Sequence, residues 1–184
     1  RFVAIGDFNN DNRLDLVIAN SYNDNVSVLL GYGNGSFATE TRYSVGSYPK
    51  SVAIGDFNND TRLDLVVANW DSNDVSVLLG HGNGSFATET RYLVGSSAAE
   101  TIYSVGSYPE SVAIGDFNKD NQLDLVVVSY LTSYVSVLLG YGNGSFRTET
   151  RYSAGSLPKS IAVGDFNNDT QLDLVVANSN SNDV

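Results

Sequence analysis

A repeating unit of 49 residues is the feature that most constrains the fold of this chain. The string GDFN occurs four times, and its copies are 49, 60 and 49 residues apart; their glycines are Gly6, Gly55, Gly115 and Gly164. LDLV also occurs four times, and GNGSF occurs three times. A fixed period of this length indicates that each copy is one supersecondary unit, which buries its apolar surface against its neighbours.

Each unit has the pattern of four short strands. In the second copy these are SVAIGDF, LDLVVAN, VSVLLG and the alternating FATETRY, all bounded by Asn, Asp and Gly. The Asn83-Gly84 pair predicts a hairpin between the last two strands. No segment has a sustained helical period. The sequence therefore predicts an all-β chain of four-stranded antiparallel meanders, which is typical of β-propeller blades. Separate small sandwiches are disfavoured, because about 49 residues bury too little core alone.

The repeats divide the chain into three complete blades and part of a fourth. We expect blade 1 at residues 1–49, blade 2 at 50–109, blade 3 at 110–158 and an incomplete blade 4 at 159–184. This is an open fragment of about three and a half blades from a seven-bladed propeller. We expect the remaining blades in the same chain, because an open arc exposes a blade face and an unpaired strand.

Blade 2 contains an insertion of 11 residues that resembles an internal duplication. ETRYLVGS begins at Glu89 and ETIYSVGS begins at Glu100, and six of the eight positions match. The hairpin before Phe86 fixes the register, so we predict that residues 86–94 form the fourth strand and that about 97–107 form a loop. The alternative is that residues 100–106 take the strand and the first copy bulges out.

An Asp-rich loop lies between the first and second strands of every unit. Asp supplies 16 of the 21 acidic residues, and 12 of these lie in four copies of D-x-N-x-D-x-x-x-D. Three carboxylates within nine residues repel one another, whereas calcium prefers six to eight oxygen ligands. We predict up to four calcium ions, one per repeat, bound by side chains at loop positions 1, 3, 5 and 9 and a backbone carbonyl at position 7. The alternative is Asx turns without metal. The predicted ligands are Asp7, Asn9, Asp11, Arg13 and Asp15; Asp56, Asn58, Asp60, Arg62 and Asp64; Asp116, Asn118, Asp120, Gln122 and Asp124; Asp165, Asn167, Asp169, Gln171 and Asp173.

Position 6 of the loop distinguishes the four copies. It holds Asn12, Thr61, Asn121 or Thr170. Calcium loops often require a positive φ at this position, which Asn tolerates and the β-branched Thr does not. We therefore predict that the Thr61 and Thr170 loops are strained or bind calcium more weakly.

The combination of GDFNNDTRLDLVVAN, VSVLLGHGNGSF and a preceding VGSYP resembles the FG-GAP and VCBS-type repeats. The resemblance covers the entire chain. It implies the calcium-binding β-propeller of integrin α chains and of many other extracellular proteins. It also implies an extracellular or cell-surface module for adhesion or protein-ligand recognition. The chain departs from the family at loop positions 4 and 6, where the family often has Gly.

Several kinds of chemistry are disfavoured by composition. A net charge of −11 argues against nucleic acid as a partner. The chain has no apolar run of 18 residues, so we expect no membrane insertion. The chain has no Cys, which excludes disulfides and thiol catalysis. Its only histidine, His81, occupies a hairpin position and has no nucleophile motif near it. We therefore expect no enzymatic activity.

Six N-x-S/T sequons occur, at Asn25, Asn34, Asn59, Asn83, Asn143 and Asn168. Asn-rich turns produce sequons by chance, so glycosylation and coincidence both stay open. Together with loops suited to extracellular calcium, they favour a secreted glycoprotein.

Meander topology separates two faces of the blades. The Asp-rich loops and the GNGSF hairpins lie at one end, and the more variable connections lie at the other. We predict a ligand face at this second end, because exposed aromatic residues on a rigid scaffold are good binding anchors. Three functions remain open: an adhesion or protein-recognition module, a lectin-like glycan-binding propeller, and a non-catalytic domain of a secreted enzyme. The residues of the predicted ligand face are Tyr22, Tyr48, Trp70, Tyr108, Tyr130 and Tyr134.

Overall fold

The computed structural model describes residues 2–93 and 107–180, and all of its regular elements are β-strands. Within these residues there is no helix that could cross a bilayer. Blade 1 contains β1 (Val3–Gly6), β2 (Asp15–Asn20), β3 (Asn25–Leu29) and β4 (Thr41–Ser44). Blade 2 contains β5 (Pro49–Gly55), β6 (Asp64–Asn69), β7 (Asp74–Leu78) and β8 (Thr90–Leu93). Blade 3 contains β9 (Pro109–Gly115), β10 (Asp124–Ser129), β11 (Tyr134–Leu138) and β12 (Thr150–Ser153), and blade 4 contains β13 (Pro158–Gly164) and β14 (Asp173–Asn178).

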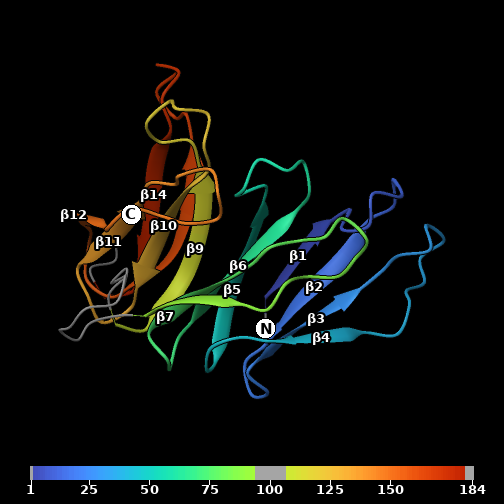
Figure 1. Cartoon of the computed structure of the whole chain (residues 1–184). Helices are drawn as coiled ribbons and strands as arrows, with labels where there is room; N and C mark the ends of the chain where they lie inside the picture. Colours follow the sequence, from blue (N-terminus) through green and yellow to red (C-terminus); the bar gives the residue numbers. More distant parts are fainter. Residues whose placement is uncertain (1, 94–106, 181–184) are drawn as a thin grey trace.

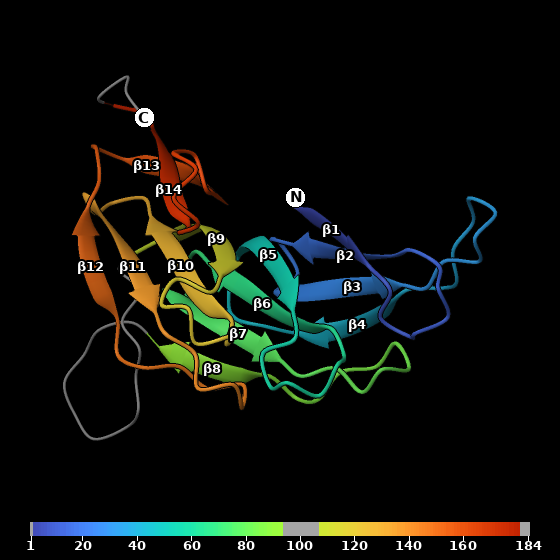
Figure 2. The ribbon, with the colours of Figure 1, turned by 90° about the horizontal axis from the view of Figure 1, so that it is seen from above.

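Each complete blade is an antiparallel meander with its strands paired in chain order. The four sheets stand side by side along an open arc (Figure 1). Viewed from above, β1, β5, β9 and β13 lie toward the inside of the arc, and β4, β8 and β12 lie toward the outside (Figure 2). This arrangement confirms the predicted all-β class and the open, propeller-type succession of blades.

The hydrophobic core lies between the blades. At the first interface, Val26 and Val28 of blade 1 pack with Leu65, Leu78 and Phe86 of blade 2. A second cluster joins blades 2 and 3 in the same way. Because both faces of the middle blades are covered, every residue of β6 and of β10 is buried, whereas β14 is only partly covered. This explains why the second strands are continuous apolar runs between a polar first and a polar last residue.

The fourth strand of blade 2 is formed by the first copy of the duplicated segment, as predicted. In the ladder between β7 and β8, Val77 pairs with Thr90 and Asp74 pairs with Leu93. The second copy, up to residue 106, lies outside the described residues. The strand begins later than predicted: Phe86 makes one isolated bridge with Gly80, and regular pairing resumes only at Thr90. The intervening Glu89 instead accepts a hydrogen bond from the Ser76 hydroxyl.

The GNGSF hairpin is not a two-residue Asn-Gly turn. In blade 2 the left-handed residues are Gly82 (φ 71°) and Gly84 (φ 83°), on either side of Asn83. The loop closes through the His81 N–H, which donates to the Ser85 carbonyl at 2.9 Å. Asn83 contributes through its side chain, because its Oδ1 accepts the Ser85 N–H at 3.0 Å. The motif therefore predicted a hairpin correctly, although its turn is longer.

Candidate calcium loops and ligand face

The acidic side chains of each Asp-rich loop stabilise its conformation by accepting hydrogen bonds from backbone N–H groups of the same loop. In loop 2 (residues 56–64), the Asp60 and Thr61 N–H groups donate to the two carboxylate oxygens of Asp56, at 3.0 and 2.7 Å. The Arg62 N–H donates to Asp60 Oδ1 at 2.9 Å. The same bonds recur in loop 1 (residues 7–15), loop 3 (116–124) and loop 4 (165–173). The loop conformation thus follows from local sequence.

The ninth-position aspartate joins the loop to the rest of its blade. Asp64 is fully buried, and its two carboxylate oxygens accept the Phe57 N–H at 2.8 Å and the Gly80 N–H at 2.7 Å. Asp15 and Asp124 are buried and bonded in the same way. Burial raises the pKa of the Asp64 carboxyl, and the two N–H bonds oppose that effect. Sequence reasoning identified these residues only as metal ligands and missed this structural role.

Loop positions 4 and 6 adopt left-handed conformations in all four copies. At position 6, Thr61 has φ of 67° and Thr170 has φ of 66°. Such a φ is strained for a β-branched residue, so the predicted strain is present. At position 4, Asn59 has φ of 58° and Lys119 has φ of 62°.

The donor atoms of the loops fit calcium in their chemistry. Each loop supplies three carboxylates, one Asn side-chain oxygen and one backbone carbonyl, which are the hard oxygen ligands that calcium prefers. A carboxylate oxygen that accepts one N–H retains a second lone pair. In the part of the chain that the structure describes, no three acidic or histidine side chains converge into a group that could hold a metal ion. The loops therefore contain oxygen atoms that suit calcium, and in this structure many of these oxygens accept hydrogen bonds from backbone N–H groups.

The predicted ligand-face residues form a continuous series of aromatic rings, here called the aromatic ridge (Tyr22, Tyr48, Trp70 and Tyr108). The ring centroids of Tyr22 and Tyr48 are 5.6 Å apart, and those of Tyr48 and Trp70 are 5.7 Å apart. Trp70 and Tyr108 are closest, at 4.5 Å. The ridge therefore crosses from blade 1 to blade 3 and joins connections that are far apart in sequence.

Two further residues predicted for the ligand face are placed differently. The Tyr130 N–H donates to the Tyr108 carbonyl at 2.9 Å, which places Tyr130 beside the end of the ridge. Lys159 Nζ lies 4.5 Å from the centre of the Tyr130 ring. Tyr134 instead lies in β11, where the Arg151 guanidinium is 4.5 Å from its ring centre. The structure therefore associates Tyr130 with the ridge and Tyr134 with the outer strands of blade 3.

The backbone of the ridge is strained at residues that precede proline. Tyr48 has φ of 58° and Tyr108 has φ of 57°, in a region that is unusual for bulky residues and disfavoured before proline. Side chains of the preceding blade hold these conformations: the Tyr48 N–H donates to Asp24 Oδ1 at 2.8 Å, and the Tyr108 N–H donates to Asn73 Oδ1 at 2.7 Å. Sequence reasoning missed Asp24 and Asn73; an Asp or Asn just before the third strand of blades 1 and 2 was the available signal.

An ion pair lies against the middle of the ridge and was also missed. Lys50 Nζ is 3.5 Å from Glu110 Oε1, and it lies 5.4 Å from the centre of the Tyr48 ring and 5.5 Å from that of Trp70. A hydrogen bond with the Tyr22 side chain raises the pKa of the Tyr48 hydroxyl. The ridge thus combines aromatic surface with charges of both signs.

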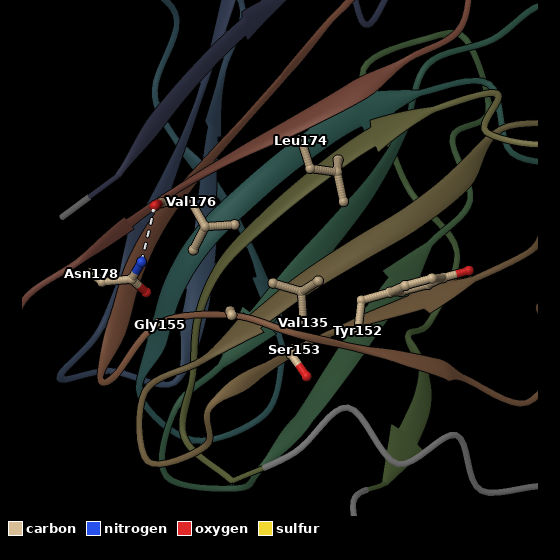
Figure 3. Close-up of a pocket in the computed structure, with 8 residues that line it drawn as sticks. Val135, Tyr152, Ser153, Gly155, Leu174, Val176 and Asn178 are labelled. Carbon is tan, nitrogen blue, oxygen red and sulfur yellow. Dashed lines mark hydrogen bonds between the residues drawn. The ribbon is translucent and has the colours of Figure 1, made fainter. Parts of the chain in front are cut away.

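A hollow of about 430 Å³ lies between the outer strands of blade 3 and β14. Figure 3 shows Val135, Tyr152 and Leu174 around it, with the Asn178 side chain hydrogen-bonded to the Val176 carbonyl. A similar hollow of about 400 Å³ lies between β4 and blade 2, where Tyr43, Leu78 and Phe86 line it. The hollow is therefore part of an inter-blade interface and provides no separate argument for a ligand site.

The hairpin end carries the remaining candidate residues. His81 is exposed in its hairpin, as predicted. Asn34, Asn83 and Asn143 are exposed at the hairpin tips, whereas Asn59 and Asn168 lie in Asp-rich loops with positive φ. Asn59 and Asn168 are exposed as well, so accessibility does not distinguish these sequons and their glycosylation stays a prediction.

Comparison with a protein family described as the FG-GAP-like repeat gives three overlapping matches, at residues 7–67, 56–127 and 116–176. No curated protein sequence matches the chain. Among solved structures, BBS1N in complex with ARL6DN is similar, with a TM-score of 0.64 and 16% identity over 96% of this chain. An Agrocybe aegerita lectin that recognises non-reducing terminal N-acetylglucosamine has a TM-score of 0.63 and 19% identity over 95% of this chain. The chain spans 50% of the BBS1N chain and 46% of the lectin chain. At these identities the likeness shows a shared fold.

Proposed function

This chain belongs to the FG-GAP-like repeat family, and on that premise we propose that it is a calcium-stabilised β-propeller module that recognises an extracellular ligand through the aromatic ridge. The proposed module is non-catalytic and works in adhesion or protein recognition. Its Asp-rich loops stabilise the scaffold at one end, and its ligand binds at the other.

One observation carries the ligand proposal: strained backbone coincides with the aromatic ridge. Tyr48 and Tyr108 hold left-handed conformations that cost about 1–3 kcal/mol each. Such strain persists where the surrounding structure fixes it, and it is concentrated at binding sites. Here Asp24 and Asn73 fix it and so preorganise the rings.

A glycan ligand is the second candidate, favoured by the rings of the ridge, because aromatic surfaces with neighbouring polar groups suit sugars as well as proteins. The structurally similar lectin recognises a glycan, and BBS1N forms a complex with ARL6DN, so this fold serves both kinds of partner in other proteins. A role as a non-catalytic domain of a secreted enzyme is also consistent with the ridge.

Binding assays on a glycan array and on a panel of extracellular proteins test the ligand proposal. The wild-type chain is compared with the Tyr48→Asn variant. Asn tolerates the left-handed backbone at this position, and the substitution removes the Tyr48 ring from the ridge. We expect this variant to bind its ligand at least tenfold more weakly and to melt within a few degrees of wild type. Tyr32→Asn, an exposed tyrosine of the hairpin end, is the control. Equal binding by all three proteins contradicts the proposal.

Thermal unfolding with calcium and with chelator tests the calcium proposal. Extracellular modules bind calcium at about 10⁻⁴–10⁻³ M, so we expect about 5 mM calcium to raise the melting temperature by several degrees. The same concentration of magnesium serves as the control, because magnesium gives up its water reluctantly and demands a smaller site. Identical melting curves in calcium and chelator would show that the loops are Asx turns without metal.

A further inference from the structure

Each GNGSF hairpin holds an asparagine side-chain amide whose carbonyl is polarised by hydrogen bonds. Asn34 Oδ1 accepts two bonds from Ser36, one from its N–H at 3.0 Å and one from its hydroxyl at 2.7 Å. Asn83 and Asn143 accept the same pair of bonds in blades 2 and 3. Donors on a carbonyl oxygen stabilise the negative charge that develops there when a nucleophile attacks the carbon. The fold therefore prepares the same amide for attack in all three hairpins.

The backbone nitrogen of the glycine that follows each asparagine can act as the nucleophile. It attacks the asparagine Cγ, so that an N–Cγ bond forms and a succinimide ring closes. The Cγ–Nδ2 bond breaks, and the side-chain nitrogen leaves as ammonia with the proton that the glycine N–H gives up. Water then opens the ring at either carbonyl and produces aspartate or isoaspartate. Glycine favours this reaction because it has no Cβ to obstruct the attack.

In blades 2 and 3 the glycine N–H is bonded to the preceding blade. The Gly84 N–H donates to the Phe8 carbonyl at 2.9 Å, and the Gly144 N–H donates to the Phe57 carbonyl at 2.8 Å. Both glycines are buried, and a leucine of the preceding blade lies against each of them. The nitrogen must leave its acceptor before it can attack, so the reaction requires local opening of the contact between the blades.

The Asn34-Gly35 pair of blade 1 does not have this protection. Within residues 2–93 and 107–180, no hydrogen bond holds the Gly35 N–H. Gly35 is exposed, and nothing lies within 4 Å of a Cβ built on it. It lines an open hollow of about 690 Å³ together with Arg13 and Tyr32. Solvent therefore reaches this glycine, and no inter-blade contact has to open before its nitrogen attacks.

We propose that the GNGSF hairpin is a site of spontaneous deamidation that the preceding blade controls, and that Asn34 is the residue that reacts in this chain. The conversion adds a negative charge at the hairpin end and removes Asn34 from its N-x-S sequon. A blade packed against blade 1 in the manner of the described interfaces would supply an acceptor for the Gly35 N–H. Reaction at Asn34 therefore also reports whether that face of blade 1 is covered.

Peptide mapping by mass spectrometry tests the order of reactivity in the 184-residue chain, prepared in a host without N-glycosylation and incubated at mildly alkaline pH. We expect Asn34 to react about tenfold faster than Asn83 and Asn143, because the latter two sites must first lose a hydrogen bond. The three sites share the sequence GNGSF, so their rates should become alike in guanidinium chloride. Equal rates in the folded chain, or the same order of rates in denaturant, overturn the proposal.

Truncation of the leucine that covers each protected glycine tests control by the blade. Leu30 lies against Gly84, and Leu79 lies against the equivalent glycine of blade 3. We expect Leu30→Ala to speed the reaction at Asn83 about three- to tenfold without changing that at Asn143, because only the first contact opens more easily. Leu79→Ala should have the reverse effect. Melting curves verify that both variants are folded during incubation, and acceleration at both sites or at neither overturns control by the blade.

Removal of one donor tests the polarised amide. Ser36→Ala keeps the backbone N–H but deletes the hydroxyl that donates to Asn34 Oδ1. We expect the reaction at Asn34 to slow about three- to tenfold, as for the loss of one hydrogen bond. Ser44→Ala, at an exposed serine of β4, is the control and should leave the rate unchanged. An unchanged rate in Ser36→Ala overturns the role of the hydroxyl and leaves the control by the preceding blade to the leucine variants.

Discussion

At the scale of the residue, the ninth aspartate of loops 1 to 3 has a structural role that is separate from any metal. Asp64 accepts two backbone N–H groups from distant parts of blade 2, and it is fully buried. Asp60, at position 5, is more exposed and bonds only within its own loop. The two carboxylates have the same chemistry, but the Asp64 carboxylate holds distant parts of the blade together, whereas the Asp60 carboxylate holds only its own loop.

Alanine substitutions should separate these roles. In chelator, we expect Asp64→Ala to lower the free energy of unfolding by about 2–4 kcal/mol, because it leaves two buried N–H groups without an acceptor. Asp60→Ala should cost less than about 1 kcal/mol in chelator. Both variants should lose the stabilisation that calcium gives at loop 2. Chemical denaturation measures the free energy of unfolding of both variants, each in calcium and in chelator. Equal losses for the two variants in chelator would contradict the structural role of Asp64.

At the scale of the element, the third strand must pass very close to the loop that precedes the second strand. Gly80 follows β7 (Asp74–Leu78), the third strand of blade 2, and a Cβ placed there would lie 2.2 Å from the Leu63 carbonyl oxygen. Gly31 and Gly140 are equally close to Leu14 and Leu123. The backbone φ of these glycines is not left-handed, so contact distance is the reason for the residue.

A Gly→Ala substitution, which adds a single methyl group, tests this constraint. We expect Gly80→Ala to destabilise the chain by about 1–3 kcal/mol, because a backbone oxygen cannot move aside as a side chain can. Gly35→Ala is the comparison: nothing lies within 4 Å of its Cβ, so only its left-handed φ of 88° resists the change. The midpoints of urea denaturation measure both, and a larger loss at Gly35 than at Gly80 would contradict the argument.

At the scale of the whole molecule, stability depends on contacts between blades. The same motif phenylalanine is 1% exposed at Phe146 and 39% exposed at Phe37, although both lie in the sequence GNGSF. Phe146 packs against Phe57 of blade 2 at a centroid distance of 5.9 Å. Phe37 is in blade 1, which has no preceding blade among the described residues.

Truncating the two phenylalanines isolates this inter-blade contribution. We expect Phe146→Ala to cost about 3–5 kcal/mol, as for other buried aromatic residues. Phe37→Ala should cost less than about 1.5 kcal/mol, because much of its surface already contacts solvent. Thermal unfolding followed by circular dichroism provides the comparison. Similar losses would show that blade-to-blade packing does not determine stability.

The repeat by itself determined the strand order, the blade topology and the placement of the Asp-rich loops and the aromatic ridge at opposite ends of the blades. These properties follow from local patterns: alternating or apolar segments form strands, and Asn, Asp and Gly end them. The left-handed conformation of Thr61 was predictable for the same reason, because the loop chemistry is contained within nine residues.

The tertiary structure alone decided which residues act across blades. Asp24 and Asn73 hold strained tyrosines, Lys50 pairs with Glu110, and Asn59 bonds to Gln122, yet none of these partners is close in sequence. The position of one blade against the next fixes these contacts. That position is set by packing of apolar side chains from both blades, which is a property of the assembled arc and of no single repeat.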